Sequence, residues 1–180
     1  MKRQIFSSIV VVGFLIGATA VGQNTDQGAK EQKIKMSELP DAVAQTLKTN
    51  CARCAIDKLT REIENGVTVY DIEFKQNQGE IAIAPDGSVI DRESVVSLND
   101  VPAAALDAIR KGAGGAKIKR VMKGEIRAEI KDGQIIKLSS SRYVYEAELE
   151  KRNQVAEIEV TAAGQIIEPP EWRRKGSKEN

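Results

Sequence analysis

The sequence predicts an α+β protein that consists of two tandem modules after an N-terminal signal peptide. Each module is expected to contain a helix followed by three to five antiparallel strands. Three observations lead to this fold class: an apolar run near the N-terminus, sequence blocks that recur in order, and strand segments that alternate apolar and charged residues. Such alternation requires a sheet with one covered and one solvent-facing side, and a packed helix provides the cover.

Residues 1–20 have the order of charge, apolar run and small residues that is typical of a secretory signal. Lys2 and Arg3 precede the apolar run, which ends in Ala18-Thr19-Ala20. The uncharged run is short for a membrane-spanning helix of about 20 residues. We therefore expect cleavage after Ala20, a periplasmic or secreted protein, and no membrane insertion of the mature chain. A retained segment that anchors the chain in the membrane is the alternative.

The composition argues against several classes of function. The chain has 27 basic and 26 acidic residues, which predicts no nucleic-acid partner, because such partners require a surplus of positive charge. It contains no histidine, which excludes Ser-His-Asp triads, Cys-His nucleophiles and His-ligated metals. We therefore predict that the protein is not an enzyme and has no cofactor. A hydrolase that works through carboxylates is the least favoured alternative.

Three blocks of the sequence occur twice in the same order. They pair residues 37–43 with 99–105, 69–74 with 144–149, and 81–91 with 158–168. The offset grows along the chain, so the second copy contains inserted residues after its helix. The predicted organisation is a flexible lead, a first module, a second module and a disordered tail, at residues 21–36, 37–94, 95–168 and 169–180.

Each copy is expected to begin with a helix. Ser37 and Asn99 are typical N-cap residues, and each is followed three positions later by a proline suited to the first turn. Glycines at 112, 114 and 115 predict the end of the second helix, because glycine favours a left-handed C-cap. Apolar residues recur at i, i+4 and i+8 in both helices: Leu39, Val43 and Leu47, then Val101, Ala105 and Ile109.

Strands separated by turn signals follow each helix. Asn65-Gly66 favours a tight hairpin, and Asn77-Gln78-Gly79 and Pro85-Asp86-Gly87 favour turns. The inserted residues of the second copy include Asp132-Gly133 between apolar positions, so we expect them to add or lengthen strands. Residues 92–98 are interpreted as the short junction between the two copies.

The alternation in the strands separates a core face from an outward face. Tyr70 and Tyr145 occupy equivalent positions among apolar residues, so we predict that both lie in the core. If the last hairpin pairs as the pattern indicates, its four glutamates project from one face of the sheet. Tyr143 shares the face of Tyr145, and we expect it to reach a rim where it touches a partner. The candidate partner-facing residues are Asp71, Glu73, Tyr143, Glu146, Glu148, Glu157 and Glu159.

The acidic row allows three interpretations. It can bind a basic partner, or it can hold calcium, which prefers carboxylate oxygens. It can also be a solvated face in which basic residues from adjacent strands alternate with the acids, and charge rows on strands favour this last interpretation. The basic residues available for that arrangement are Lys117, Lys119, Arg127 and Lys137.

The helix-opening Leu39-Pro40, the strand 69–74 and the turn 86–89 together resemble the PepSY-like domains, also called β-lactamase-inhibitor-like. These domains are exported bacterial modules that commonly occur in tandem, and the resemblance covers residues 37–168 in two copies. It implies a helix packed on an antiparallel sheet in each copy, with the uncovered sheet faces available to another protein. The resemblance therefore implies an exported, non-catalytic binding or inhibitor-like module whose partner is an exported or envelope protein.

Cys51 and Cys54 form a C-x-x-C motif, which the repeat alignment places at the end of the first helix. The helix dipole disfavours a thiolate there, whereas redox motifs of this type occupy a helix N-terminus. Ala55 stands where attachment of a c-type haem requires histidine. We predict a local disulfide between these cysteines. An envelope protein with a redox or disulfide-exchange role, and two free thiols, are the alternatives.

Overall fold

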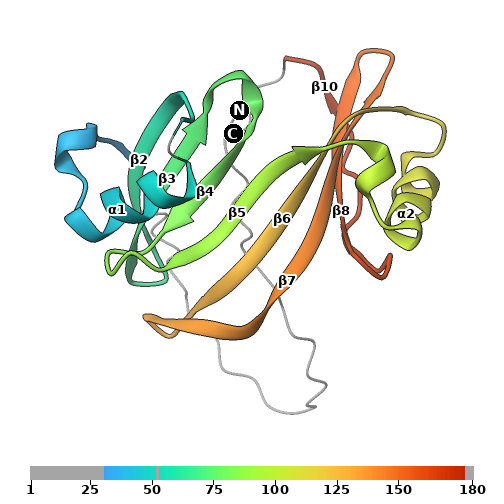
Figure 1. Cartoon of the computed structure of the whole chain (residues 1–180). Coiled ribbons are helices and arrows are strands. Elements are labelled where there is room, and N and C mark those ends of the chain that lie inside the picture. Colours follow the sequence, from blue (N-terminus) through green and yellow to red (C-terminus); the bar gives the residue numbers. More distant parts are fainter. Residues whose placement is uncertain (1–30, 52, 177–180) are drawn as a thin grey trace, which may run out of the picture.

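The computed structural model describes residues 31–51 and 53–176, which form ten strands and two α-helices (Figure 1). The first half contains β1 (Gln32–Lys33), α1 (Asp41–Asn50), β2 (Ile56–Glu64), β3 (Val67–Phe74), β4 (Gly79–Ile83) and β5 (Val89–Val96). The second half contains α2 (Ala103–Ala113), β6 (Lys117–Lys131), β7 (Gln134–Lys151), β8 (Gln154–Thr161), β9 (Ile166–Glu168) and β10 (Arg173–Arg174). The predicted signal peptide lies outside the described residues.

All ten strands belong to one antiparallel sheet with the order β1-β2-β3-β4-β5-β6-β7-β8-β10, and β9 also pairs with β8. The prediction of two tandem helix-and-sheet modules is therefore wrong. The two halves are joined by β5 and β6, which pair from Asp91 opposite Ile126 to Val96 opposite Val121. Part of the expected junction thus continues β5, because pairing with β6 satisfies backbone groups that an edge strand would leave open.

The inserted residues of the second half form a long hairpin. β6 has 15 residues and β7 has 18, and they are joined at Asp132 and Gly133, which both have positive φ angles. Positive φ at both central residues is the requirement of the tight hairpin turn that Asp-Gly sequences favour. The sequence-based expectation of added or lengthened strands is confirmed.

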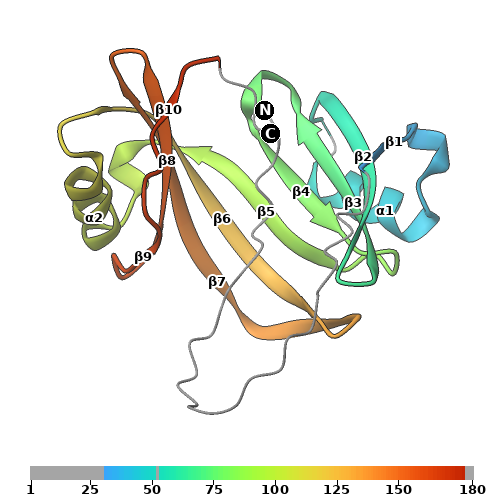
Figure 2. The same cartoon turned by 180° about the vertical axis from the view of Figure 1, so that it is seen from behind.

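Both helices lie on the same side of the sheet, near its two ends (Figures 1 and 2). The side chains of directly opposed residues in an antiparallel sheet share a face. The cross-strand pairs connect Ile81 to Arg92, Arg92 to Glu125 and Glu125 to Tyr143. Ile81 packs with α1, and Tyr143 shares its side of β7 with Tyr145, which packs with α2. The opposite side of the sheet carries no helix of the described chain.

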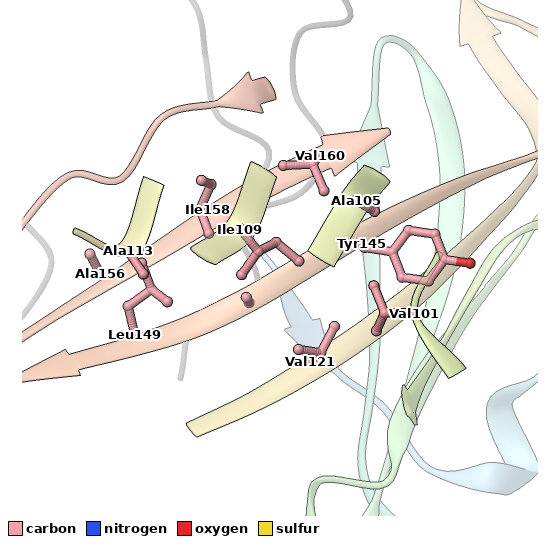
Figure 3. Close-up of a cluster of buried hydrophobic side chains, with 11 residues drawn as sticks. Val101, Ala105, Ile109, Ala113, Val121, Tyr145, Leu149, Ala156, Ile158 and Val160 are labelled. Atoms are coloured by element: carbon pink, nitrogen blue, oxygen red, sulfur yellow. The ribbon is translucent and has the colours of Figure 1, made fainter. Parts of the chain in front are cut away.

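Each helix packs on a separate buried cluster. The cluster under α1 contains Leu39, Val43, Leu47, Leu59, Tyr70, Ile72, Phe74, Ile81 and Ile83. The cluster under α2, shown in Figure 3, contains Val101, Ala105, Ile109, Ala113, Val121, Tyr145, Ala147, Leu149, Ala156, Ile158 and Val160. Trp172 packs against this cluster. Both predicted core tyrosines are buried, and the predicted apolar stripes of both helices face these clusters.

The helix ends follow the sequence signals in part. The N-cap residues are Pro40 and Pro102, so the prediction that Ser37 and Asn99 cap the helices is wrong. Ser37 and Asn99 instead lie in short 3-10 turns, Met36–Glu38 and Leu98–Asp100, that lead into the helices. Gly114 has a φ of 54° and forms the left-handed C-cap predicted for α2.

Two turn glycines occupy equivalent places beside the two helices. Gly87, between β4 and β5, has a φ of 83° and lies against Ala42 in the first turn of α1. Gly164, between β8 and β9, has a φ of 82° and lies against Ala104 in the first turn of α2. A Cβ atom at either glycine would press on the helix carbonyl oxygen. The recurring glycine in the sequence therefore reflects a recurring helix–turn contact.

A third buried cluster shows that the sheet curls toward its helix-free side. Val69, Ala82, Ala84 and Ile90 face that side, and Ile130 and Ile135 from the β6–β7 hairpin pack against them. The Asn65-Gly66 turn of β2 and β3 lies against the Asp132-Gly133 turn of this hairpin. The β6–β7 hairpin thereby meets β2 and β3, from which β4 and β5 separate it in the sheet, over the helix-free side.

Short strands pair at both edges of the sheet. β1 pairs with β2 through Gln32 and Lys33, within the range expected to be a flexible lead. β10 pairs with β8 through Arg173 and Arg174, within the range expected to be a tail. The described residues include no helix that is long and apolar enough to cross a membrane.

Candidate binding surface

Most of the predicted partner-facing residues lie on the helix-free side of the sheet. Glu73 is opposite Glu80 on β4, and Glu80 is opposite Glu93 on β5. Val95, two residues after Glu93, is opposite Met122, which is opposite Glu146. We call this side of β2–β9 the acidic face; its acidic residues are Glu62, Glu64, Asp71, Glu73, Glu80, Asp91, Glu93, Glu146, Glu148, Glu150, Glu157, Glu159 and Glu168.

Three glutamates form a continuous row across the last strands of the acidic face. Glu146 on β7 is directly opposite Glu159 on β8, and Glu159 is opposite Glu168 on β9. Glu159 is only 5% exposed, and no other described side chain forms a hydrogen bond or ion pair with it. We call these three residues the glutamate row. Like charges at directly opposed positions destabilise a sheet, so packing alone does not account for this row.

Burial and mutual repulsion alter the ionisation of the glutamate row. Burial raises the pKa of Glu159 to about 8, and the negative charges of Glu168 and Glu146 add to the shift. Burial also raises the pKa of Glu146 to about 7, with contributions from Glu157 and Glu80 that Arg120 partly opposes. Both carboxyls therefore hold a proton over part of the neutral pH range.

The neighbouring row of the acidic face is neutralised within the protein. Glu148 and Glu157 are directly opposite each other, one step along the strands from the glutamate row. The Nη2 atom of Arg120 lies 3.6 Å from a carboxylate oxygen of Glu148. The Nη2 atom of Arg173 lies 3.4 Å from a carboxylate oxygen of Glu157. Two arginines thus balance these two acids.

The far end of the acidic face is also neutralised by a basic side chain. The Nζ atom of Lys58 on β2 donates a hydrogen bond of 2.9 Å to Glu73, and Lys58 also forms an ion pair with Glu31. Burial lowers the pKa of Lys58, but the hydrogen bonds to Glu31 and Glu73 outweigh this effect and raise it. The carboxylate of Glu73 is therefore balanced by a basic side chain of β2.

Tyr143 lies on the other side of the sheet from the predicted glutamates, on the side that carries the helices. Its side chain is 40% exposed, and the Nζ atom of Lys123 lies 4.2 Å from its ring centroid. Nearby, Glu125 accepts hydrogen bonds from Arg127 and Ser141. The seven predicted residues therefore separate into six on the acidic face and one beside the helices.

Sequence reasoning missed several members of the acidic face, including Glu62, Glu80, Asp91, Glu93 and Glu168. The alternation of Glu80 with Ile81 and Ile83 was a usable signal for the outward position of Glu80. The position of Glu62 follows from the pairing of β2 with β3, whereas those of Asp91, Glu93 and Glu168 required the pairing of β5 with β4 and β6 and of β9 with β8. The β5–β6 register joins strands that a helix separates in the sequence.

The structure bears differently on two interpretations of the acidic row: calcium binding, and a solvated face in which basic residues alternate with the acids. In the part of the chain that the structure describes, no three acidic or cysteine side chains are grouped so that they could hold a metal ion. Two of the basic residues predicted to interleave do form ion pairs, Lys119 with Glu150 and Arg127 with Glu125. The basic residues nearest the glutamate row are instead Arg120 and Arg173, which form ion pairs with Glu148 and Glu157 of the neighbouring row.

Cys51 and Cys54 are joined by a disulfide directly after α1. Cys51 is the C-cap of this helix, and its N–H donates a 2.8 Å hydrogen bond to the carbonyl oxygen of Leu47. Both half-buried cysteines pack against the cluster under α1. A helix C-terminus does not favour a thiolate, so the structure does not support the redox alternative.

Replacing both cysteines with serine should have a small effect on stability. A disulfide that closes so short a loop removes little entropy from the unfolded chain, so we expect a loss of about 2 kcal/mol or less. Urea unfolding of Cys51→Ser/Cys54→Ser, compared with the parent chain under oxidising and reducing conditions, measures this loss. A loss above about 4 kcal/mol would show that the bridge has a larger role in the fold.

Comparison with known proteins identifies the fold but no sequence family. No family model matches the chain, and no curated protein matches it. A candidate periplasmic protein from Bacteroides eggerthii is 14% identical, with a TM-score of 0.50 over 76% of this chain and 88% of that chain. A DUF2874 family protein from Bacteroides uniformis is 16% identical, with a TM-score of 0.48 over 75% and 88%. A BLIP-like protein from Bacteroides fragilis is 15% identical, with a TM-score of 0.46 over 79% and 92%.

Proposed function

We propose that this chain is an exported, non-catalytic module of the periplasm that binds a protein partner on its acidic face. The glutamate row is the observation that carries this proposal. A sheet covered by helices on one side is stable when its other side is polar and mixed in charge. A row of opposed carboxyls costs stability, and departures of this kind are expected where a surface serves function.

Two features support a binding role over catalysis. The whole sequence lacks histidine, and both cysteines are held in a disulfide, so neither supplies a thiolate nucleophile. The acidic residues extend across β2–β9. An extended surface of this kind suits recognition of another protein.

Three features support the periplasm as the place of action. The disulfide between Cys51 and Cys54 is suited to an oxidising compartment. The similar fold from Bacteroides eggerthii belongs to a candidate periplasmic protein. A secretory signal at residues 1–20 provides the route of export.

Photo-crosslinking in intact cells tests where a partner binds. A photoreactive phenylalanine analogue is placed either at Glu148, half-buried on the acidic face, or at Asp107, exposed on α2. Irradiation at position 148 should produce a crosslinked species of higher mass, and position 107 should produce none. Crosslinks at 107 alone, or at neither position in cells that express both variants equally, would contradict the proposal.

A further inference from the structure

We propose that the acidic face recognises a cationic segment of a protein, and that the glutamate row holds a lysine or arginine side chain of that segment. This inference rests on the proposed binding function and specifies the chemistry of the partner. It follows from three features of the surface: the unbalanced charge of the row, the burial of Glu159, and the apolar residues that continue the row.

The charge of the glutamate row is unbalanced, whereas that of its surroundings is largely balanced. Facing the row are Glu80 from β4, Arg120 from β6, Glu148 and Glu157 from the neighbouring row, and Arg173 from β10. Both arginines form ion pairs with the neighbouring row. Three carboxyls are therefore left facing one another, and a partner's cation is the group that complements them.

The burial of Glu159 is a second indication that the glutamate row binds a ligand. It is 95% removed from solvent on the acidic face, and the described residues offer its carboxyl no hydrogen bond or ion pair. A carboxyl with so little access to water and no partner within the described protein is costly to ionise. A lysine ammonium or arginine guanidinium placed between it and its cross-strand neighbours would remove that cost.

The spacing of the row suits a long cationic side chain. Directly opposed residues have Cβ atoms roughly 5 Å apart, which allows two carboxyls to reach one cation from either side. Along the same row, Glu146 is followed by Met122 and Val95. These apolar side chains offer contact to the aliphatic part of a lysine or arginine, whose charged end then lies among the glutamates.

Binding of a cation is coupled to release of protons. The pKa of Glu159 is raised to about 8 and that of Glu146 to about 7, so both carboxyls are partly protonated at neutral pH. A cation favours their ionised forms and therefore displaces these protons. Affinity should rise as the pH rises from 6 to 8.5 and should fall with added salt.

Calorimetric titration of the mature chain with a synthetic peptide tests this inference. The probe is an acetylated, amidated peptide of four alternating lysine–serine pairs, and the control peptide has glutamine in place of lysine. We expect at least about tenfold tighter binding at pH 8.5 than at pH 6. Heats that differ between buffers of different ionisation enthalpy should report the released protons.

Matched variants separate the glutamate row from general surface charge. Glu146→Gln/Glu159→Gln should weaken binding at pH 8.5 by about tenfold and abolish proton release. Asp107→Asn removes an exposed acid of α2 and should leave both unchanged. Equal affinity of the double variant and the parent, or affinity independent of pH, would overturn the inference.

The two proposals fail in distinguishable ways. If the lysine peptide does not bind while position 148 still crosslinks to a protein in cells, the cationic partner is wrong and the binding function stands. If the peptide does not bind and position 148 does not crosslink, both are wrong.

Discussion

Replacing Ile158 with alanine should lower the free energy of unfolding by about 3–4 kcal/mol. Ile158 is fully buried in the cluster under α2, together with Ile109 and Leu149 (Figure 3). Gly112 brings the backbone of α2 so close to β8 that a Cβ atom there would overlap Cδ1 of Ile158. Replacement of the isoleucine therefore leaves a cavity beneath a rigid helix, and the surrounding side chains and backbone can move little to fill it.

Urea unfolding followed by circular dichroism measures this loss. Ile166→Ala on β9 is the matched control, because Ile166 is 45% exposed and the same substitution should cost less than about 1 kcal/mol there. If the two variants lost similar stability, α2 would not be held by this cluster. Loss of cooperative unfolding in Ile158→Ala alone would point to separation of the helix from the sheet.

The folded protein should become less stable as the pH rises from about 5 to 8.5. An unperturbed glutamate has a pKa of about 4.3, whereas the pKa of Glu159 in the folded protein is about 8. Between these values the folded state holds a proton that the unfolded state has lost, so the free energy of unfolding falls as the pH rises. This contribution is complete below the unfolded pKa and is lost once the pH exceeds the folded pKa.

Glu159→Gln should remove most of this pH dependence. Glutamine cannot ionise, so the variant should be more stable than the parent at pH 8.5 by on the order of 2 kcal/mol, since partial solvation offsets some of the burial. Urea unfolding at pH 5.5, 7 and 8.5 gives both slopes. Glu171→Gln, at an exposed position, should retain the slope of the parent. A slope unchanged in Glu159→Gln would show that other groups control the pH dependence.

The pH dependence of stability and the pH dependence of binding have the same cause, the ionisation of the glutamate row. Ionisation of the glutamate row weakens the isolated fold but strengthens its attraction for a cation. A bound cationic segment should therefore restore the stability that is lost at high pH. The measured gain in unfolding free energy on binding links the two experiments.

Local features of the sequence predicted most of the local structure, apart from the N-caps of the two helices. The apolar stripes of Val43 and Ile109, the core positions of Tyr70 and Tyr145, and the glycine C-cap of α2 were all predicted from residue type and spacing. Helix periodicity and strand alternation arise from backbone geometry within a few residues. The common face of the four glutamates of β7 and β8 was also predicted, because strand alternation assigns it, whereas the direct pairing of Glu146 with Glu159 came from the structure.

The arrangement of the sheet was decided by contacts between distant residues. Pairing of β5 with β6 made one sheet from the two expected modules, and it placed Glu80 and Glu146 on the same face. A shift of one residue in that pairing would have moved every side chain of β6 to the other face. Turn signals do not encode a register between strands separated by a helix. Local alternation also does not report burial, and burial is what raises the pKa of Glu159. The sequence by itself therefore determined which residues point outward from each strand. The tertiary structure decided which of these residues lie opposite one another and which are removed from solvent.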